Sequence, residues 1–374
     1  MTPTFQHGLV IGKFYPPHAG HHFLIRTAAR HCEQLTVVVL PSSGESIPLP
    51  LRLQWLRHAY ADWPHVQITG VMDDLAVDYH DDHLWAAHVE LMREGIRLAD
   101  RLRPTTRPVD AVFTSEPYGE EMARRFDATP VCLDPCRDVY PVSGTRVRAN
   151  PASCWRFLAS DVQAWLAVRV IIVGAESTGK TTLVQNLTRH FQNTAEFAAT
   201  QWVAEYGREY SWVKLALARA IHLRQQQPEP GLGDLSWSSG EFHHIALEQS
   251  ARENALAEGS GPLLIADTDA FATAIWHERY TGNRSPAVES LLADLPGRRL
   301  YLLTDAASVP FVQDGIRDGE HIRAWMQARF HERLAAHGHP WRLVQGDAKA
   351  CLAQSITAIE EFLAATWNFT APLG

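Results

Sequence analysis

The stretch from Gly174 to Thr182 (G-A-E-S-T-G-K-T-T) combines glycine, lysine and hydroxyl side chains at a spacing that suits phosphate chemistry. Gly174, Gly179, Lys180 and Thr181 form the pattern G-x-x-x-x-G-K-T, and the apolar run V-R-V-I-I-V precedes them. Such a loop turns backbone N–H groups toward phosphates, while the lysine meets the β- and γ-phosphates and the threonine reaches Mg²⁺. A chance glycine-rich turn is the alternative, which the preceding strand pattern disfavours. We therefore predict an ATP-binding P-loop; its predicted ATP-binding set also includes Ser177, Thr178 and Thr182.

A second candidate for phosphate chemistry lies near the N-terminus, in G-K-F-Y-P-P-H-A-G-H. His18 and His21 belong to an H-x-G-H pattern that resembles the signature of the nucleotidyltransferase family, at a predicted helix start where anions bind. Attack on the α-phosphate of ATP needs no protein nucleophile; it needs positioning and neutralisation of charge, which imidazole and ammonium groups supply. We predict that these histidines and Lys13 are catalytic; the alternative is a pair of surface histidines. The predicted ATP-binding residues of this loop are Gly12, Phe14 and Gly20.

The run P-V-S-G-T-R-V-R at 141–148 places small hydroxyls and an arginine at another predicted helix start. It resembles the second signature of the same family. Ser143 and Thr145 would meet the ATP phosphates, and Arg148 would reach in as a catalytic cation. Two signatures in the expected order make a coincidence improbable, so we predict one adenylyl-transfer site built from both.

The first half contains three candidate substrate contacts. Arg52 follows the turn I-P-L-P-L-R and is a candidate phosphate contact, although a solvated arginine at a helix start explains it equally well. The run 110–116 reads as a strand ending at Thr114 and Ser115, which places both hydroxyls at the carboxyl edge of a parallel sheet, where nucleotides bind.

In the second half, P-L-L-I-A-D-T-D at 262–269 reads as a buried strand that ends in two carboxylates. Asp267 would lie beside the Mg²⁺ held by Thr181, or accept a proton from the substrate hydroxyl; a helix-capping aspartate is the alternative. Alternation along a strand would turn Asp269 to the same side, where it would bind the ribose.

Further substrate and lid residues come from three loops. The cluster A-E-Y-G-R-E-Y at 204–210 reads as a substrate-holding loop or the start of an amphipathic helix, and Arg317, in a glycine-flanked segment, suits a lid over ATP. The run 225–240 is rich in turn formers, and Glu241 is placed to cap the next helix. The predicted substrate-binding residues are Glu205, Tyr206, Arg208 and Trp237.

These motifs require strands that end where the loops begin. Residues 9–14 and 35–40 read as strands around a helix at 21–31, which is a βαβ unit of a parallel sheet. We predict an α/β protein with two domains. Residues 1–165 would form a Rossmann-like nucleotidyltransferase domain, and residues 166–374 a P-loop kinase domain, each with a parallel sheet.

Bulk properties exclude several classes. The formal net charge of −8 disfavours a general nucleic-acid binder. The first six residues carry no signal-peptide pattern, and no apolar run approaches the length of a membrane span. The five scattered cysteines indicate reduced thiols in a cytoplasmic protein, and Cys132 with Cys136 lacks the second pair of a zinc site. Self-association into a homo-oligomer stays open.

Together these motifs resemble one family, the bifunctional NadR-type proteins, which join nicotinamide-nucleotide adenylyltransferase to ribosylnicotinamide kinase. The likeness covers nearly the whole chain, including F-T-S-E at 113–116, E-Y-G-R-E-Y at 205–210 and D-T-D-A-F-A-T at 267–273. It implies a multifunctional enzyme of NAD biosynthesis and salvage, with Mg²⁺ and two uses of ATP. Nicotinamide riboside would give the mononucleotide NMN, and NMN would give NAD and pyrophosphate.

The resemblance has further consequences. It implies that Trp85 stacks on the nicotinamide ring, as an aromatic does in related enzymes; a core tryptophan is the alternative. Some family members begin with a helix-turn-helix domain, but the first predicted strand here begins at Leu9, so we expect no DNA binding. Segment 225–235 looks like an insertion.

Two other functions compete with this one. The first is another bifunctional kinase–adenylyltransferase, such as an FAD-forming enzyme, which the P-loop disfavours. The second is a non-catalytic sensor of NAD or ATP, which would not need His18, His21, Lys180 and Asp267.

Overall fold

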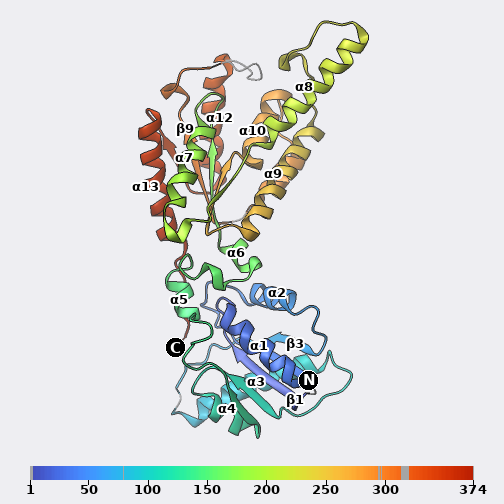
Figure 1. The fold of residues 1–374 in the computed structure, drawn as a ribbon, viewed down its shortest axis with the longest axis vertical. Helices are drawn as coiled ribbons and strands as arrows, with labels where there is room; N and C mark the ends of the chain where they lie inside the picture. Colours follow the sequence, from blue (N-terminus) through green and yellow to red (C-terminus); the bar gives the residue numbers. More distant parts are fainter. Residues whose placement is uncertain (1–2, 79, 294, 296, 313–319, 374) are drawn as a thin grey trace. The chain divides into compact units, whose positions relative to one another are not determined.

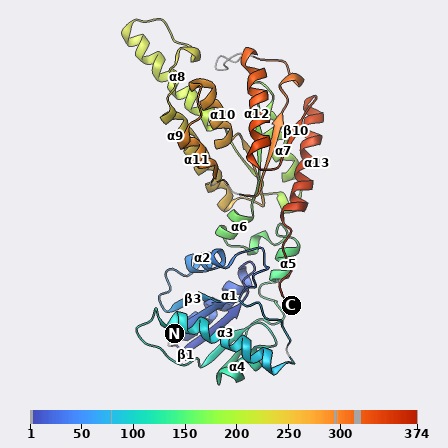
Figure 2. The same ribbon diagram turned by 180° about the vertical axis from the view of Figure 1, so that it is seen from behind.

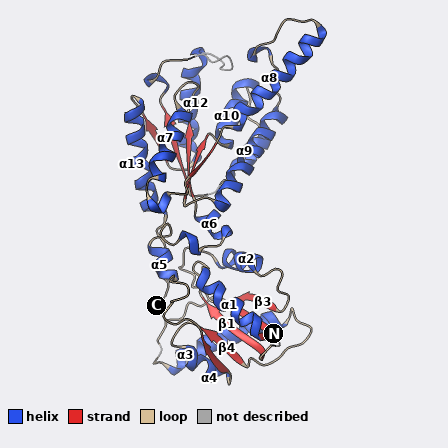
Figure 3. Cartoon of the chain, in the orientation of Figure 1, coloured by secondary structure: helices blue, strands red, loops and turns tan. Residues whose placement is uncertain are grey.

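In the computed structural model, which describes residues 3–78, 80–293, 295, 297–312 and 320–373, the chain divides into two compact units. The first unit contains residues 1–162 and 367–374, and the second contains residues 163–366. Each unit has one five-stranded sheet whose paired strands are all parallel, so the predicted fold class is confirmed (Figure 3).

The sheet of the first unit has the order β3-β2-β1-β4-β5. The chain order reverses at β1, which pairs with β2 on one side and β4 on the other. In open parallel sheets ligands bind at such a switch point, beyond the carboxyl ends of the strands. The strands are β1 (Phe5–Gly12), β2 (Cys32–Val39), β3 (Val66–Gly70), β4 (Ala111–Thr114) and β5 (Thr129–Cys132).

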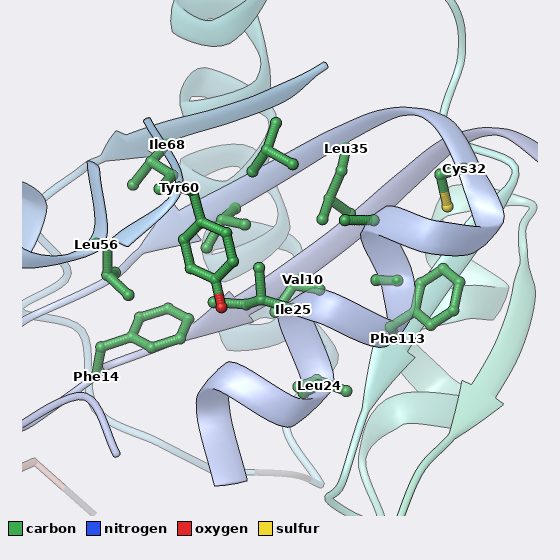
Figure 4. Close-up of a cluster of buried hydrophobic side chains, with 14 of the residues drawn as sticks. Val10, Phe14, Leu24, Ile25, Cys32, Leu35, Leu56, Tyr60, Ile68 and Phe113 are labelled. Atoms are coloured by element: carbon green, nitrogen blue, oxygen red, sulfur yellow. The ribbon is translucent and has the colours of Figure 1, made fainter. Parts of the chain in front are cut away.

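Helices cover both faces of this sheet, because its strands are apolar on both sides. On one face α1 and α2 enclose a core that includes Ile25, Leu35 and Phe113 (Figure 4). On the other face α3 and α4 pack against Leu9, Val38 and their neighbours. The helices are α1 (Ala19–His31), α2 (Leu49–Ala59), α3 (Asp82–Asp100), α4 (Gly119–Phe126) and α5 (Gly144–Ala149), and α6 (Ser160–Leu166) straddles the division between the units.

The second unit has the strand order β10-β9-β6-β8-β7. β6 lies at its centre and is buried along its whole length, which explains why all its residues except Arg169 are β-branched and apolar. Helices α7 and α13 pack together on one face, as both ribbon views show, and α8, α9 and α10 form a group of their own (Figures 1 and 2). The strands are β6 (Val168–Val173), β7 (Gln201–Val203), β8 (Leu263–Asp267), β9 (Arg299–Thr304) and β10 (Trp341–Val344). The helices are α7 (Lys180–Gln192), α8 (Tyr206–Gln225), α9 (Ser239–Gly259), α10 (Ala270–Thr281), α11 (Pro286–Ala293), α12 (Arg323–His337) and α13 (Ala348–Thr366).

Two details differ from or add to the sequence expectations. β8 ends at Asp267, two residues earlier than predicted, because Thr268 adopts a positive φ of 65° and turns the chain. The capping of α9 is as predicted: Ser238 and Glu241 form a reciprocal capping box. No helix among the described residues is long and apolar enough to cross a membrane.

Candidate active sites

The P-loop connects β6 to α7 in the second unit. Gly174 has a φ of 147°, and a Cβ atom there would lie 2.3 Å from the Thr304 hydroxyl, so glycine is required. Gly179 has a φ of 80° and precedes the first residue of α7. Lys180 Nζ donates to the carbonyls of Gly174 (3.1 Å) and Ala175 (2.8 Å) and so lies across its own loop. Backbone amides, a helix N-terminus and an ammonium group therefore converge as a phosphate site requires.

Two carboxylates stand beside this loop. Asp267 ends β8, is 2% exposed, and accepts a hydrogen bond of 2.5 Å from Thr181 Oγ1. Its second oxygen, Oδ1, is buried and has no hydrogen-bond partner among the described residues. Burial raises the pKa of Asp267. Burial, followed by the charge of Asp267, raises the pKa of Glu205 to about 7. Both carboxyls thus hold a proton more tightly than an exposed carboxyl does, although the ammonium group of Lys180 is near.

A cavity of about 200 Å³ extends from the P-loop between α8, α9 and α10. Its lining includes three of the residues predicted to bind substrate, which are Glu205, Arg208 and Trp237. Its far wall is an aromatic chamber, which consists of Trp237, Phe242, Trp276 and Tyr280. The Trp237 and Tyr280 rings lie 5.4 Å apart, centre to centre. A flat, positively charged ring attached to a hydroxylated chain would fit aromatic walls at one end and phosphate groups at the other.

Asp269 does not reach this cavity, so its predicted role in binding the ribose is wrong. It is fully buried, caps α10 through Ala272 N (3.2 Å), and accepts hydrogen bonds from Arg299 Nη1 (2.9 Å) and Tyr301 Oη (2.7 Å). Arg299 also pairs with buried Glu253. The turn at Thr268 explains the difference, because it breaks the strand alternation that would have put both carboxylates on one side.

Three other predicted residues of this unit are placed differently or lie outside the description. Tyr206 does not line the cavity among the described residues; its ring lies under the Arg252 guanidinium, and its N–H donates to Gln249. The Thr178 hydroxyl bonds to Ala175 O and Thr304, so this side chain holds the loop closed instead of facing phosphate. Arg317 lies outside the described residues. Ser177 and Thr182 line the cavity.

The histidine loop of the first unit follows β1 and opens α1. The rings of His18 and His21 are stacked, with centres 3.8 Å apart, and the Phe14 ring lies 4.9 Å from His21. Burial lowers the pKa of His18 to about 3 and the pKa of His21 well below its ordinary value; the neighbouring histidines and Arg137 add to this. Both Nδ1 atoms are buried and have no hydrogen-bond partner among the described residues.

The stacked pair is therefore neutral and carries two buried polar atoms that an ordered water or a ligand could bind. Gly20 permits the pair, since a Cβ atom there would lie 3.2 Å from the His18 ring. The Phe14 side chain belongs to the core, so only its backbone can meet ATP (Figure 4).

The 141–148 segment reaches the same loop. Ser143 caps α5 by accepting from Arg146 N (3.2 Å). Arg148 donates to Tyr15 O (2.8 Å) and to Thr145 Oγ1 (3.3 Å), and its guanidinium lies 4.9 Å from the Tyr15 ring. The two sequence signatures thus meet in space. The Arg148 side chain is tied to the loop that carries the histidines.

Arg52 is the clearest correction in this unit. Its side chain is fully buried and donates to Ile47 O, to Lys13 O (2.8 Å) and to Glu45 Oε2 (2.6 Å). An arginine with these partners supports the end of β1; the predicted phosphate contact is not compatible with its burial. Lys13 itself is partly exposed, with its Nζ 3.4 Å from Glu45 Oε1.

Trp85 is a core residue, which was the alternative to nicotinamide stacking. It is 7% exposed, packs with Val89 and Met92 of its own helix, and faces the Arg125 guanidinium. Thr114 does end β4, but it is buried, and its hydroxyl accepts from Glu116 N (2.9 Å). Ser115 follows at the carboxyl edge of the sheet.

Sequence reasoning missed the far half of the kinase-side cavity. Trp276 and Tyr280 lie one helical turn apart on α10, and this i, i+4 spacing after D-T-D was an available signal. It also missed the buried ion pairs that Arg169 and Arg299 form with Glu253. Arginines within the apolar strands V-R-V-I-I-V and R-L-Y-L-L-T were the signal for Arg169 and Arg299, since a charge in a buried strand requires a partner.

Comparisons with known proteins agree with this geometry. A family model described as "AAA domain" matches residues 169–350. The trifunctional NAD biosynthesis/regulator protein NadR of Escherichia coli (strain K12) is 25% identical over 326 residues, which cover 83% of this chain and 71% of the relative. NadR of Salmonella typhimurium is 24% identical, with the same coverage of both chains. A solved structure of NadR in complex with NR covers 97% of each chain at a TM-score of 0.65 and 20% identity. A second, with NAD and AMP-PNP, has a TM-score of 0.66 and 18% identity and covers 97% of this chain and 98% of the other.

Proposed function

We propose that this chain, a homologue of the NadR proteins over most of its length, catalyses two ATP-dependent steps of NAD biosynthesis. The second unit phosphorylates nicotinamide riboside, and the first transfers an adenylyl group from ATP to the resulting NMN. The observation that supports this assignment most strongly is that one chain contains two separate phosphate sites, the P-loop and the stacked-histidine loop. A single-function kinase or transferase would need only one.

In the kinase unit, the cavity orders the two reactants. The aromatic chamber would hold the cationic pyridinium ring, and the P-loop would hold the ATP phosphates, so the riboside 5′-hydroxyl meets the γ-phosphorus between them. A new O–P bond forms as the bond to ADP breaks, and the hydroxyl proton must leave. Glu205 suits this transfer, because a carboxylate with a pKa of about 7 can accept a proton near neutral pH.

The residues also fit a Mg²⁺ ion. Asp267 Oδ1 is a buried oxygen without a partner among the described residues, and Thr181 Oγ1 is hydrogen-bonded to the other oxygen of the same carboxylate. Hard oxygen donors of this kind are the ligands Mg²⁺ prefers, and the bound ion would neutralise phosphate charge. Asp267 would then act as a metal ligand, and Glu205 as the proton acceptor.

In the transferase unit, an NMN phosphate oxygen attacks the α-phosphorus of ATP, and pyrophosphate leaves. The neutral histidine pair can donate hydrogen bonds to the phosphoryl oxygens, while Lys13 and Arg148 supply positive charge. The residues that would contact the triphosphate here are Gly12, Gly20, Ser143 and Thr145. No side-chain contact to the nicotinamide ring is assigned in this unit, because Trp85 is packed in the core.

A product analysis tests the proposal. The purified chain is incubated with nicotinamide riboside, ATP and Mg²⁺, and nucleotides are separated by chromatography. We expect ADP and NMN first, then NAD and pyrophosphate; NMN with ATP should give NAD directly. Binding of riboside or NAD without turnover would instead identify a sensor. Turnover of a different nucleoside in preference to the riboside would identify another bifunctional enzyme.

A further inference from the structure

The segment 367–373 belongs to the same unit as the histidine loop and contacts that loop at Tyr15. Tyr15 Oη donates to Thr370 O (3.1 Å), and the Tyr15 and Phe369 rings meet edge to face with centres 6.2 Å apart. Thr370 makes two further hydrogen bonds to Ser46, one between the hydroxyls (2.6 Å) and one from its N–H (2.8 Å). The segment 367–373 is therefore held by Tyr15 and Ser46, which are more than 300 residues away in sequence.

The same segment takes up a cation that the proposed transfer reaction needs. Lys13 Nζ donates to the backbone carbonyl of Leu373 and also lies 3.4 Å from Glu45 Oε1. Tyr15, which holds Thr370, is itself flanked by the Arg52 and Arg148 guanidinium groups at 4.4 and 4.9 Å from its ring centre. Leu373 thus lies beside Lys13, and Thr370 is held by a ring that Arg148 also faces; these are the two cations that are proposed to meet the triphosphate.

We propose that the C-terminal segment 367–373 is an internal competitor for the adenylyl-transfer site, which ATP must displace before Lys13 can contact its phosphates. This inference rests on the proposed function of the histidine loop. A neutral carbonyl is a weaker partner for an ammonium group than a triphosphate is, so the exchange favours ATP once it arrives. The tail lowers the apparent affinity for ATP by the fraction of molecules in which it is bound.

The first test removes tail contacts from the full chain. Phe369→Ala combined with Thr370→Val deletes the aromatic contact and the hydroxyl bond to Ser46. Since one neutral hydrogen bond is worth roughly a fivefold change in an equilibrium, we expect the KM for ATP in adenylyl transfer to fall about fivefold with kcat unchanged. Kinase constants should not move, because the segment belongs to the first unit.

Two matched variants control this experiment. Thr370→Ser keeps the hydroxyl, and Thr357→Val makes the same exchange as Thr370→Val at an exposed position of α13. Both should retain the wild-type KM for ATP. An unchanged or raised KM for ATP in the double variant would overturn the proposal that the segment competes with ATP. It would indicate that the segment only supports the fold. If the wild-type chain makes no NAD at all, the proposed function fails instead.

The second test uses the unmodified protein and so does not depend on any variant folding. Carboxypeptidase Y is added with and without ATP, and the mass of the C-terminus is followed. We expect ATP to accelerate removal of the last residues, while nicotinamide riboside, a ligand for the kinase cavity, leaves the rate unchanged. Protection by ATP, or no change with ATP, would contradict displacement.

Discussion

Glu205 offers a sharp test of the electrostatics of the kinase cavity. Its carboxyl group lies in the same cavity as Lys180 and Arg208, and burial together with Asp267 raises its pKa from 4.5 to about 7. The folded state therefore binds the Glu205 proton more tightly than the unfolded state does. Glu205→Gln keeps the shape of the side chain and removes this titration.

The sign and size of the change in unfolding free energy follow from the difference in Glu205 proton binding between the folded and unfolded states. Between about pH 4.5 and pH 7 the folded carboxyl keeps a proton that the unfolded one has lost, so stability falls as the pH rises through this window. A tenfold change in proton affinity corresponds to about 1.4 kcal/mol, so a rise from 4.5 to about 7 sets an upper limit of about 3.5 kcal/mol for the full cost above pH 7. Sharing of this cost with Asp267 reduces the expected gain of Glu205→Gln to about 1–2 kcal/mol, or roughly 2–8 °C in Tm for a unit of this size.

Thermal unfolding measures this directly. The wild type and Glu205→Gln are compared from pH 5 to pH 8.5 without nucleotide and with a chelator, and Glu258→Gln, an exposed carboxylate on α9, is the control. We expect the variant to gain stability relative to the wild type as the pH rises, with a plateau above about pH 7.5. Its kinase activity should be lost, since the same group is the proposed proton acceptor. A stability difference that is constant with pH, or reversed in sign, would refute the reasoning.

Four further substitutions probe both sites. Lys180→Ala should abolish riboside phosphorylation and leave adenylyl transfer within a few-fold; loss of both activities in a folded protein would contradict independent sites. His21→Ala should lower kcat for NAD synthesis about 10²-fold with a modest change in KM, and a normal kcat would make the histidine loop structural. Asp267→Asn should depress kinase kcat and weaken the dependence on Mg²⁺ in steady-state assays. Asp269→Asn should destabilise the kinase unit by about 2 kcal/mol in urea unfolding, because Arg299 keeps Glu253 but loses its charged hydrogen-bond partner Asp269; an unchanged midpoint would exclude that role.

The sequence predicted those parts of the molecule whose chemistry is local. The P-loop, the H-x-G-H loop and the strands before them are each contained in a few consecutive residues. The positive φ of Gly174 accounts for the glycine at that position. The alternation of buried strands and amphipathic helices was enough to predict two parallel α/β units. The capping box at Ser238 was equally readable, because its two partners are three residues apart.

The errors came from side chains whose partners and direction are decided only by the folded backbone. Arg52 was assigned to phosphate because its contacts with Glu45 and with the end of β1 appear only after folding. The C-terminal segment was assigned no role, since its contacts with Tyr15 and Ser46 cross more than 300 residues. Patterns of residue type carry little information on such pairings.

The turn at Thr268 shows how one backbone angle separates two carboxylates into different roles. Had β8 continued to Asp269, a third carboxylate would have joined Asp267 and Glu205 beside the P-loop, where the ATP phosphates are proposed to bind. Instead, the positive φ at Thr268 directs Asp269 away from the cavity, where Arg299 and Tyr301 neutralise it and where it caps α10. That helix carries Trp276 and Tyr280 of the aromatic chamber. The buried carboxylate therefore fixes the start of α10, which carries two walls of the proposed substrate cavity, while Asp267 stays beside Thr181 of the P-loop.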